Sequence, residues 1–186
     1  SLWNTGLPAG WSQTGFGADY GSNYDAIGGN AGKMDNTGDV LVINFTGTAN
    51  TLSYYLGGNS LSGSYIFDVL ESADGVSYTT VRSHTSLSNQ IIAAPGASWS
   101  SSLLATTRYV KFIYTTKATG NVGIDGVNIS FVSTNTITTN TALVGSPFCV
   151  TSSTGAAVSV PFTSVGTFNA GNVYTAQLSN AAGSFA

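Results

Sequence analysis

Apolar and polar residues alternate along several short stretches of the chain, and turn-forming residues separate these stretches. The alternation is clearest over residues 107 to 115, where Val110 and Phe112 occupy one set of positions and Lys111 falls in the other. Successive side chains of a strand point to opposite faces, so the pattern predicts a strand with Val110 and Phe112 in the core. No window of the sequence shows a convincing helical period, which favours an all-β protein.

Ten runs of this kind are rich in β-branched and aromatic residues and are bounded by Gly, Asn, Ser or Thr. They span residues 39–47, 51–58, 64–72, 77–83, 89–95, 108–116, 121–132, 148–153, 157–168 and 172–180. Short strands with one apolar face are typical of antiparallel sheets that pack face to face. The predicted fold is therefore an all-β, antiparallel jelly-roll sandwich, followed by part of an immunoglobulin-like β-module.

An Asp-Gly pair lies between two of these runs, in the stretch LESADGVSYTTV. Asp74 and Gly75 tolerate positive backbone φ angles, so they predict a hairpin turn between residues 64–72 and 76–83. In the alternative interpretation, Glu71 and Asp74 share a cation, although a hard cation needs several more oxygen ligands around it.

The character of the sequence changes near residue 132. Residues 133–147 are rich in Thr and Asn and nearly free of large apolar residues, which indicates a linker or the first edge strand of a new module. We predict a jelly-roll domain over 1–132, a linker over 133–140 and a partial immunoglobulin-like module over 141–186. The last module has fewer strands than the roughly seven of a complete sandwich, so we expect its edges to pair with a following part of the protein or with another chain.

Composition narrows the range of partners. The chain has 186 residues, five Lys and Arg residues and a formal net charge of −3. Nucleic acid is excluded as a partner, because phosphate binding needs clustered basic residues. Cys149 is the only cysteine in the sequence, which excludes an intrachain disulfide. No apolar stretch approaches the roughly 18 residues of a membrane span, so we predict no membrane insertion.

The sequence offers little catalytic chemistry. Its single histidine, His84, follows a predicted strand in a Ser- and Thr-rich segment, and we expect it to be an exposed loop residue. The Gly-x-Ser-x-Gly elbow and the His-x-x-x-His metal motif are both absent from the sequence. Asp68 and Glu71 lie three positions apart on one strand and so face opposite sides, which argues against a pair of glycosidase carboxylates. The prediction is a non-enzyme.

Aromatic residues in Gly-rich and loop-like segments are the stronger functional signal. Flat rings on a rigid sandwich stack on sugar faces, with Asn and Asp nearby to bond the hydroxyl groups. The candidate carbohydrate-binding residues are Trp11, Tyr20, Tyr24, Tyr55 and Trp99. In the alternative, such rings close the ends of the core, which we favour for Trp3 and Trp11. Tyr54 and Tyr55 are adjacent on one strand, so one of them is expected outside.

Four stretches carry a family resemblance over residues 1 to 132: GLPAGWSQTG, DVLVINFTGTANTLSYYLGGN, FDVLESADGVSYTTV and TRYVKFIYTTKATGNVGIDGVNIS. Together they resemble the discoidin-like or carbohydrate-binding-module-like jelly rolls of large secreted proteins of Bacteroidetes. The tail beginning GSPFCVTSSTG resembles the start of an immunoglobulin-like repeat of the same class of surface proteins. The resemblance implies export, by the type IX route, within a multidomain adhesin or polysaccharide-degrading enzyme.

The resemblance also implies a metal site. Jelly rolls of this class use a structural calcium ion to tie the first turns to the last strand, where GNVGIDGVNIS carries Asp125. Asp25, Asp35 or Asp39 would then be partner ligands, since calcium prefers oxygen ligands. In the alternative, Asp125 accepts only backbone hydrogen bonds.

These observations predict a non-catalytic module of a secreted or cell-surface protein that binds a polysaccharide or surface glycan, with calcium as a possible structural ion. Two alternatives stay open: a structural segment of a surface filament or adhesin stalk, and the accessory domain of a secreted hydrolase.

Overall fold

The computed structural model describes residues 3, 6–21, 24, 29–132, 135–139, 160–166, 168, 170–175, 182 and 184. The chain divides into two compact units, Ser1–Val132 and Ser133–Ala186, and each is described by itself. Every regular element in the described ranges is a β-strand, and neighbouring strands are antiparallel. The predicted all-β, antiparallel fold class is confirmed.

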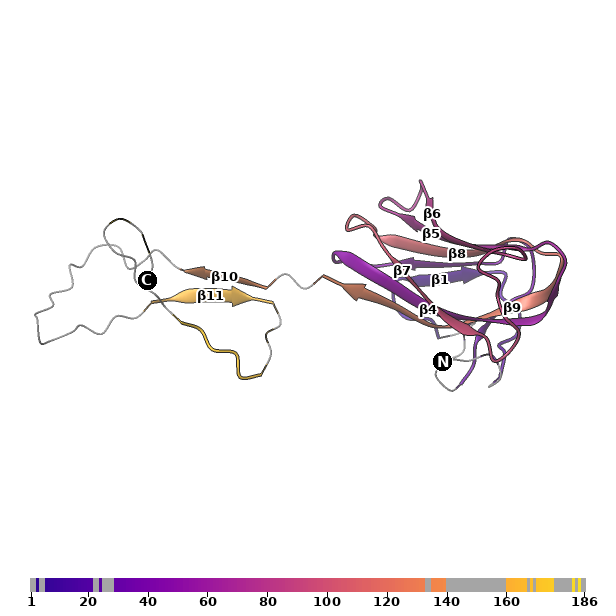
Figure 1. The fold of residues 1–186 in the computed structure, drawn as a ribbon, viewed down its shortest axis with the longest axis horizontal. Helices are drawn as coiled ribbons and strands as arrows, with labels where there is room; N and C mark the ends of the chain where they lie inside the picture. The colour runs from indigo at the N-terminus through magenta and orange to yellow at the C-terminus, as the bar shows by residue number, and fades with distance from the viewer. Residues whose placement is uncertain are drawn as a thin grey trace, which may run out of the picture. The chain divides into compact units, whose positions relative to one another are not determined.

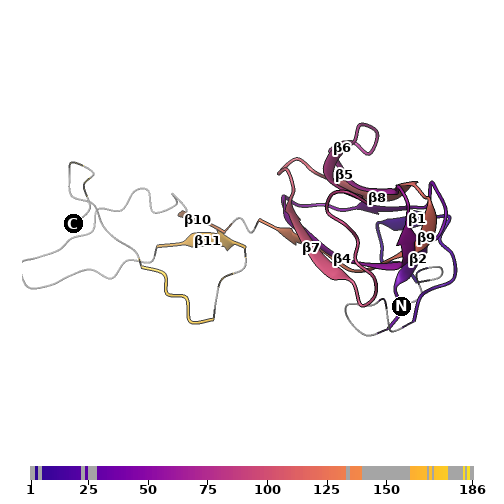
Figure 2. The same cartoon turned by 45° about the vertical axis from the view of Figure 1, so that its right-hand side comes forward.

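Unit 1 is a sandwich of two sheets that face each other (Figure 1, Figure 2). The five-stranded sheet has the order β1-β3-β8-β5-β6, formed by β1 (Trp11–Thr14), β3 (Val40–Asn44), β8 (Tyr109–Thr116), β5 (Ile66–Ser72) and β6 (Thr79–Thr85). The four-stranded sheet has the order β2-β9-β4-β7, formed by β2 (Gly32–Met34), β9 (Thr119–Phe131), β4 (Ala49–Ser62) and β7 (Ala97–Ser102). The chain crosses repeatedly between the sheets, as in jelly-roll sandwiches.

The core lies between the two sheets. Alternate residues of β8 fill it, and Val110, Phe112 and Tyr114 are fully buried there, as their spacing predicts. The four-stranded sheet contributes Tyr54 and Leu56 from β4, which face the same interior. Burial raises the pKa of the Tyr114 phenol to about 12.

The Asp-Gly turn joins β5 and β6 as a hairpin. Gly75 has a φ of 76°, and the Asp74 carboxylate accepts the backbone N–H groups of Val76 and Ser77. These bonds lower the pKa of Asp74. Glu71 points elsewhere and accepts hydrogen bonds from the backbone N–H of Leu104 and the Thr107 hydroxyl. Asp74 therefore serves the turn, as predicted.

Some predicted elements differ from the structure. The run 89–95 is not a strand: it passes through Asn89 at a φ of 48° and makes one isolated bridge, Gly58 to Ala93. The strand in this part of the chain is β7, which the Ser-rich sequence concealed because serine carries little hydrophobic signal. The short strands β1 and β2 were not predicted either.

In unit 2 the described residues form one antiparallel pair, β10 (Thr136–Thr139) with β11 (Phe162–Val165). The linker predicted for 133–140 therefore contains a strand. Tyr174 packs its ring 5.0 Å from that of Phe162, and residues 172–175 are not in a strand. The predicted run 148–153 lies outside the described residues. No helix in the described ranges has the length and apolar character needed to cross a membrane.

Candidate functional site

The first wall of the candidate site is built by a tight turn before β1. The backbone N–H of Trp11 donates to the carbonyl oxygen of Pro8, and Gly10 has a φ of 83°. A side chain at Gly10 would overlap the carbonyl oxygen of Asn44, whose N–H donates to the Gly10 carbonyl at 2.7 Å. This close approach requires glycine, and it fixes Trp11 at the start of β1, opposite Ile43 on β3.

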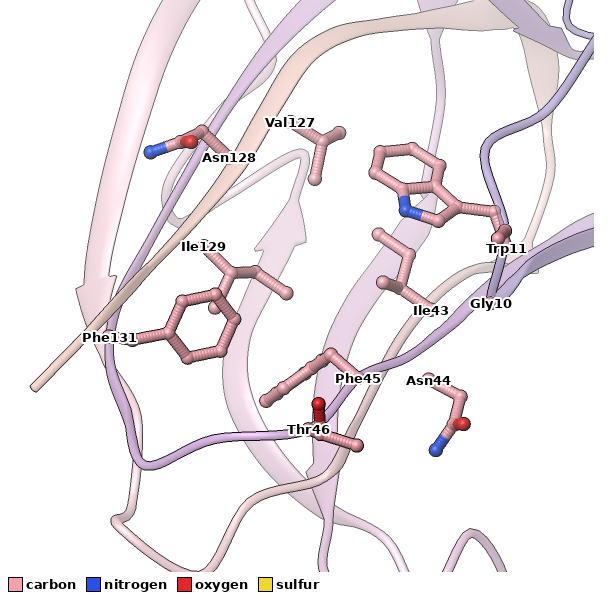
Figure 3. A pocket seen from close by; sticks show the side chains of 11 residues that line it. Gly10, Trp11, Ile43, Asn44, Phe45, Thr46, Val127, Asn128, Ile129 and Phe131 are labelled. Atoms are coloured by element: carbon pink, nitrogen blue, oxygen red, sulfur yellow. The ribbon is translucent and has the colours of Figure 1, made fainter.

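The second wall is built by a bulge in β9. Gly126 has a φ of 57°, and the pairing of β4 with β9 shifts register between Ser53 and Tyr55. A bulge adds one residue to a strand and so reverses the alternation beyond it. Before the bulge Ile124 faces the core; after it Ile129 does. The odd-numbered residues 127, 129 and 131 thereby turn toward β1 and β3 (Figure 3).

A groove of about 550 Å³ lies between these two walls, at the edge of the sandwich where the sheets separate (Figure 3). Its main lining side chains are apolar or aromatic: Trp11, Ile43, Phe45, Val127, Ile129 and Phe131. Phe45 and Phe131 meet edge to face, with ring centroids 5.5 Å apart, and 45% of Phe131 is exposed. Volumes of this size are typical of small-molecule binding sites.

Polar groups are few in the groove. Figure 3 shows the indole nitrogen of Trp11 facing the interior, and it has no hydrogen-bond partner among the residues that the structure describes. Thr46, two residues after the end of β3, adds a hydroxyl group. The side chains of Asn44 and Asn128 point away from the interior and lie at its rim (Figure 3). No described residue in the lining of the groove carries a charge.

A smaller hollow of about 220 Å³ shares Trp11 and Val127 with the groove. Trp3 lies on its other side, with its ring centroid 6.1 Å from that of Trp11, and its indole N–H donates to the carbonyl of Asn30 at 2.8 Å. Among the described residues that line this hollow, Asp125 is the only one with a charged side chain. The groove and the hollow therefore adjoin on the two sides of Trp11.

Three other candidate aromatics lie on the outer face of the four-stranded sheet. Tyr20 and Tyr24 stack with their ring centroids 4.2 Å apart and contact the sheet at Gly123. The Tyr20 hydroxyl accepts hydrogen bonds from the amides of Asn59 and Asn121. Tyr55 faces the same side and is only 9% exposed.

Tyr54 and Tyr55 are therefore both buried, and the expectation that one lies outside is wrong. Tyr54 is in the core, while Tyr55 is covered on its own face of the sheet. The prediction followed from alternation alone, which does not show that the segment between β1 and β2 covers part of the outer face.

Trp99 lies at the opposite edge of the sandwich, on strand β7 and not in a loop. Its ring centroid is 4.6 Å from that of His84, and the Arg82 guanidinium lies over the Trp99 ring at 5.3 Å. The same guanidinium donates to the Ser100 carbonyl and the Ser101 hydroxyl, so it joins β6 to β7. Trp11, the tyrosine group and Trp99 thus occupy three separate places.

His84 is not an exposed loop residue, which corrects the prediction. It lies on β6 with no exposed surface. Its Nδ1 is 2.7 Å from the Asn89 carbonyl oxygen, which only accepts, so Nδ1 carries the proton and Nε2 accepts from the Tyr54 hydroxyl at 2.9 Å. Burial lowers the pKa of His84 to about 4, so the ring is neutral at neutral pH.

The predicted metal ligands are only partly described. Asp39 is buried, and its Oδ2 accepts the backbone N–H groups of Asp35 and Asn36 at 2.7 and 2.8 Å. Asp125 lies opposite Tyr55 in the sheet, and Asp25 falls outside the described residues. The described ranges contain no cluster of three or more His, Cys, Asp or Glu side chains that could hold a metal ion.

Of the residues that line the groove, the sequence singled out Trp11, as a candidate for stacking on a sugar or for closing the end of the core, but not Phe45, Ile129 or Phe131. In the sequence these three look like ordinary strand residues. Phe45 lies 34 positions from Trp11, and Ile129 and Phe131 lie 118 and 120 positions from it, so only the fold brings all four side chains to one groove. One local signal was available: a glycine inside a strand, as in GIDGVNIS, indicates a bulge.

Comparison with protein-family models finds no family that the sequence matches, and comparison with curated proteins finds no relative. Several solved structures have a similar fold, among them three adhesin domains. The K1 cleaved adhesin domain of Lys-gingipain from Porphyromonas gingivalis is 16% identical, with a TM-score of 0.52 over 71% of this chain and 96% of that domain. The K3 domain of the same protein is 15% identical, with a TM-score of 0.51 over 70% of this chain and 97% of that domain. The K2 domain of Lys-gingipain is 18% identical, with a TM-score of 0.50 over 67% of this chain and 91% of that domain.

At these identities the likeness is one of fold. It agrees with the two-sheet sandwich of unit 1, which resembles adhesin domains in architecture. The more specific resemblances, to discoidin-like modules and to an immunoglobulin-like repeat, stay predictions.

Proposed function

We propose that unit 1 is a non-catalytic carbohydrate-binding module of a secreted or cell-surface adhesin, and that the groove beside Trp11 is its ligand site. The observation that carries the proposal is the groove itself, in which three partly exposed aromatic rings surround a space of about 550 Å³. The similarity of the fold to Lys-gingipain adhesin domains supports an adhesive role and an extracellular location.

The chemistry of the groove suits a sugar chain. A pyranose presents C–H groups on its faces and hydroxyl groups at its edges. The rings of Trp11, Phe45 and Phe131 offer flat apolar surfaces to such faces. The Trp11 indole N–H donates to a hydroxyl oxygen, and Thr46 both donates and accepts, which sets the orientation of the ligand.

A non-catalytic role agrees with the state of the candidate catalytic groups. His84 is neutral, buried and engaged at both ring nitrogens, so it is not accessible to a substrate. Asp68 accepts hydrogen bonds from the hydroxyls of Ser83 and Thr115, whereas Glu71 bonds to Thr107, so the two carboxylates serve separate polar contacts.

The test is a glycan-array screen of the protein, followed by titration calorimetry with the strongest soluble ligand. Replacing Phe131 by Ala should weaken binding at least tenfold, because the residue forms one wall of the groove. Leu87→Ala is the matched control: Leu87 is 94% exposed and lies outside the groove, so binding should not change. Equal affinities of wild type and Phe131→Ala would place the ligand elsewhere, and an array without any bound glycan would disprove the carbohydrate function.

A structural calcium ion remains a hypothesis that rests on the sequence resemblance. The described residues do not by themselves supply a ligand set, since Asp39 already uses Oδ2 for two backbone N–H groups. The site therefore depends on Asp25 joining Asp125 and Asp39. If calcium binds only the folded state, adding a chelator to calcium-loaded protein should lower the melting temperature. An unchanged melting temperature would contradict the hypothesis.

A further inference from the structure

We infer that the groove recognises an acetamido group, so that the ligands of the module are glycans that contain N-acetylhexosamines. The inference rests on the proposed carbohydrate function and names its ligand class. Three observations support it: the Trp11 indole N–H that faces the interior, the aliphatic floor beside this donor, and a described lining without charged side chains.

The Trp11 indole nitrogen determines which polar group a ligand can place inside the groove. An indole N–H only donates, and this one faces the interior without a partner among the described residues (Figure 3). A sugar hydroxyl that accepts the bond still carries a proton of its own, which then faces an apolar wall, and a desolvated donor without a partner is costly. An amide carbonyl oxygen accepts the same bond and carries no proton. An acetamido carbonyl therefore suits this position better than a hydroxyl group does.

The floor of the groove suits the methyl end of the same group. Ile43, Val127 and Ile129 point into the space between the Trp11 indole and the Phe131 ring (Figure 3). Ile43 is buried, and Val127 and Ile129 pack against the core, so the fold holds this floor in place. A methyl group that moves from water onto these side chains gains free energy. An acetamido group carries its carbonyl oxygen and its methyl group on one carbon atom, so both reach their partners together.

The uncharged lining disfavours the amine from which an acetamido group is made. A protonated amine offers only donors, and the indole N–H cannot accept from it. No described residue in the lining has a carboxylate to pair with the positive charge, and an unpaired charge that loses water is costly. The expected order of affinity for the three substituents is therefore acetamido, then hydroxyl, then amine.

The experiment compares glycans that differ only in the substituent at carbon 2 of the sugar. Chitohexaose, cellohexaose and hexa-β-1,4-glucosamine share one backbone and carry acetamido, hydroxyl and amine groups there. N-acetyllactosamine with lactose, and the methyl glycosides of N-acetylgalactosamine and galactose, are further matched sets, which distinguish a long polymer from a short glycan as the source of the group. In every set that the protein binds, calorimetry should give the acetamido member an affinity about tenfold or more above that of its hydroxyl partner. The amine member should bind most weakly.

Two variants test the donor and the floor separately. Trp11→Phe keeps a ring in the groove but removes the N–H, so the preference for the acetamido member should fall to about threefold or less. Trp99→Phe is the same change at the other edge of the sandwich and should keep the wild-type preference. Val127→Thr replaces a methyl group of the floor by a hydroxyl group and should reduce the preference about threefold. Val76→Thr is its control, at an exposed site outside the groove.

Melting curves verify that each variant is folded. Equal affinities for acetamido and hydroxyl members, or tighter binding of a hydroxyl or amine member, would overturn the inference and leave the carbohydrate function standing. An unchanged preference in Trp11→Phe, or in Val127→Thr if the first variant does not fold, would have the same meaning. Failure of every glycan to bind would overturn both the inference and the carbohydrate function.

Discussion

The two edges of the sandwich differ in how the side chain of a tryptophan is covered. Each has a tryptophan on its edge strand that points inward, Trp11 on β1 and Trp99 on β7. At the second edge Arg82 covers the Trp99 ring, and hydrogen bonds from the guanidinium to β7 join the two sheets. At the first edge, none of the described residues places a cation over Trp11, and its ring borders the groove.

This difference shows how one sandwich can have one edge that is covered by its own side chains and another edge that is available for binding. The closed edge, which we define as Arg82, Trp99 and their partners Tyr54 and His84, uses both nitrogens of His84 and the Arg82 guanidinium in hydrogen bonds within the protein, although the Trp99 indole nitrogen has no partner in the described part of the chain. The open edge, which we define as the groove, leaves rings and an indole N–H available. We infer that side chains at the closed edge carry stability, whereas those at the open edge carry binding.

The largest expected effect is on stability at the closed edge. Trp99→Ala removes the contacts with His84 and Arg82 and should lower the free energy of unfolding by about 3–5 kcal/mol. Phe131→Ala, at the open edge, should cost about 1 kcal/mol, because nearly half of the residue is already exposed. Urea unfolding of both variants measures the contrast.

Trp99→Phe is the control within this pair. The Trp99 indole nitrogen is buried without a hydrogen-bond partner in the described part of the chain, so removing it while keeping a ring should cost less than half as much as alanine. Similar losses in Trp99→Ala and Phe131→Ala would show that the two edges do not differ in the way we infer.

A second effect follows from the neutral His84. Burial lowers its pKa in the folded protein to about 4, whereas the unfolded chain titrates near pH 6.5. Between these values the unfolded chain binds a proton that the folded protein does not. The stability contributed by the neutral ring is therefore complete above about pH 6.5 and falls as the pH drops toward 4, by about 3 kcal/mol in total.

The matched variant is His84→Gln, whose amide can donate to the Asn89 carbonyl and accept from Tyr54 but does not titrate. Chemical unfolding at a series of pH values should show a smaller loss of stability in this variant between pH 6.5 and 4. Parallel pH curves for the two proteins would mean that His84 becomes protonated in the folded state without penalty.

Local patterns in the sequence predicted the parts of the fold that depend on local rules. Alternation placed Val110 and Phe112 in the core, and turn chemistry placed the hairpin at Asp74 and Gly75. Both features arise from the covalent geometry of a few neighbouring residues. The all-β class follows from the same rules applied along the whole chain.

The edges could not be predicted in this way, because they depend on which strands come together. Nothing local marks His84 as buried: its burial depends on Trp99 and Tyr54, which belong to the other sheet. The groove likewise needs Trp11 to meet Phe131, 120 positions further along, after a bulge at Gly126 has reversed the alternation of β9.

The smallest expected effect is on glycan affinity in a pair of glycine-to-alanine variants. Both variants strain the backbone, but only one of them changes the shape of the groove. Gly47 and Gly38 both have positive φ angles, of 105° and 92°. A Cβ at Gly47 would lie 3.1 Å from the Phe131 ring, whereas one at Gly38 meets nothing within 4 Å. Gly47→Ala and Gly38→Ala should each lower stability by about 1–2 kcal/mol, since alanine is strained at such angles.

Only Gly47→Ala should also change binding. Its methyl group must displace the Phe131 ring by a few tenths of an ångström, and the ring forms one wall of the groove. We therefore expect glycan affinity to fall about threefold in Gly47→Ala and to stay at the wild-type value in Gly38→Ala, with calorimetry as the measurement. Because both variants carry the same kind of backbone strain, a general loosening of the sandwich would lower affinity in both. A loss of affinity confined to Gly47→Ala would instead mean that the ligand contacts the Phe131 ring and depends on its position. Unchanged affinity in both variants would mean that the ligand does not contact Phe131.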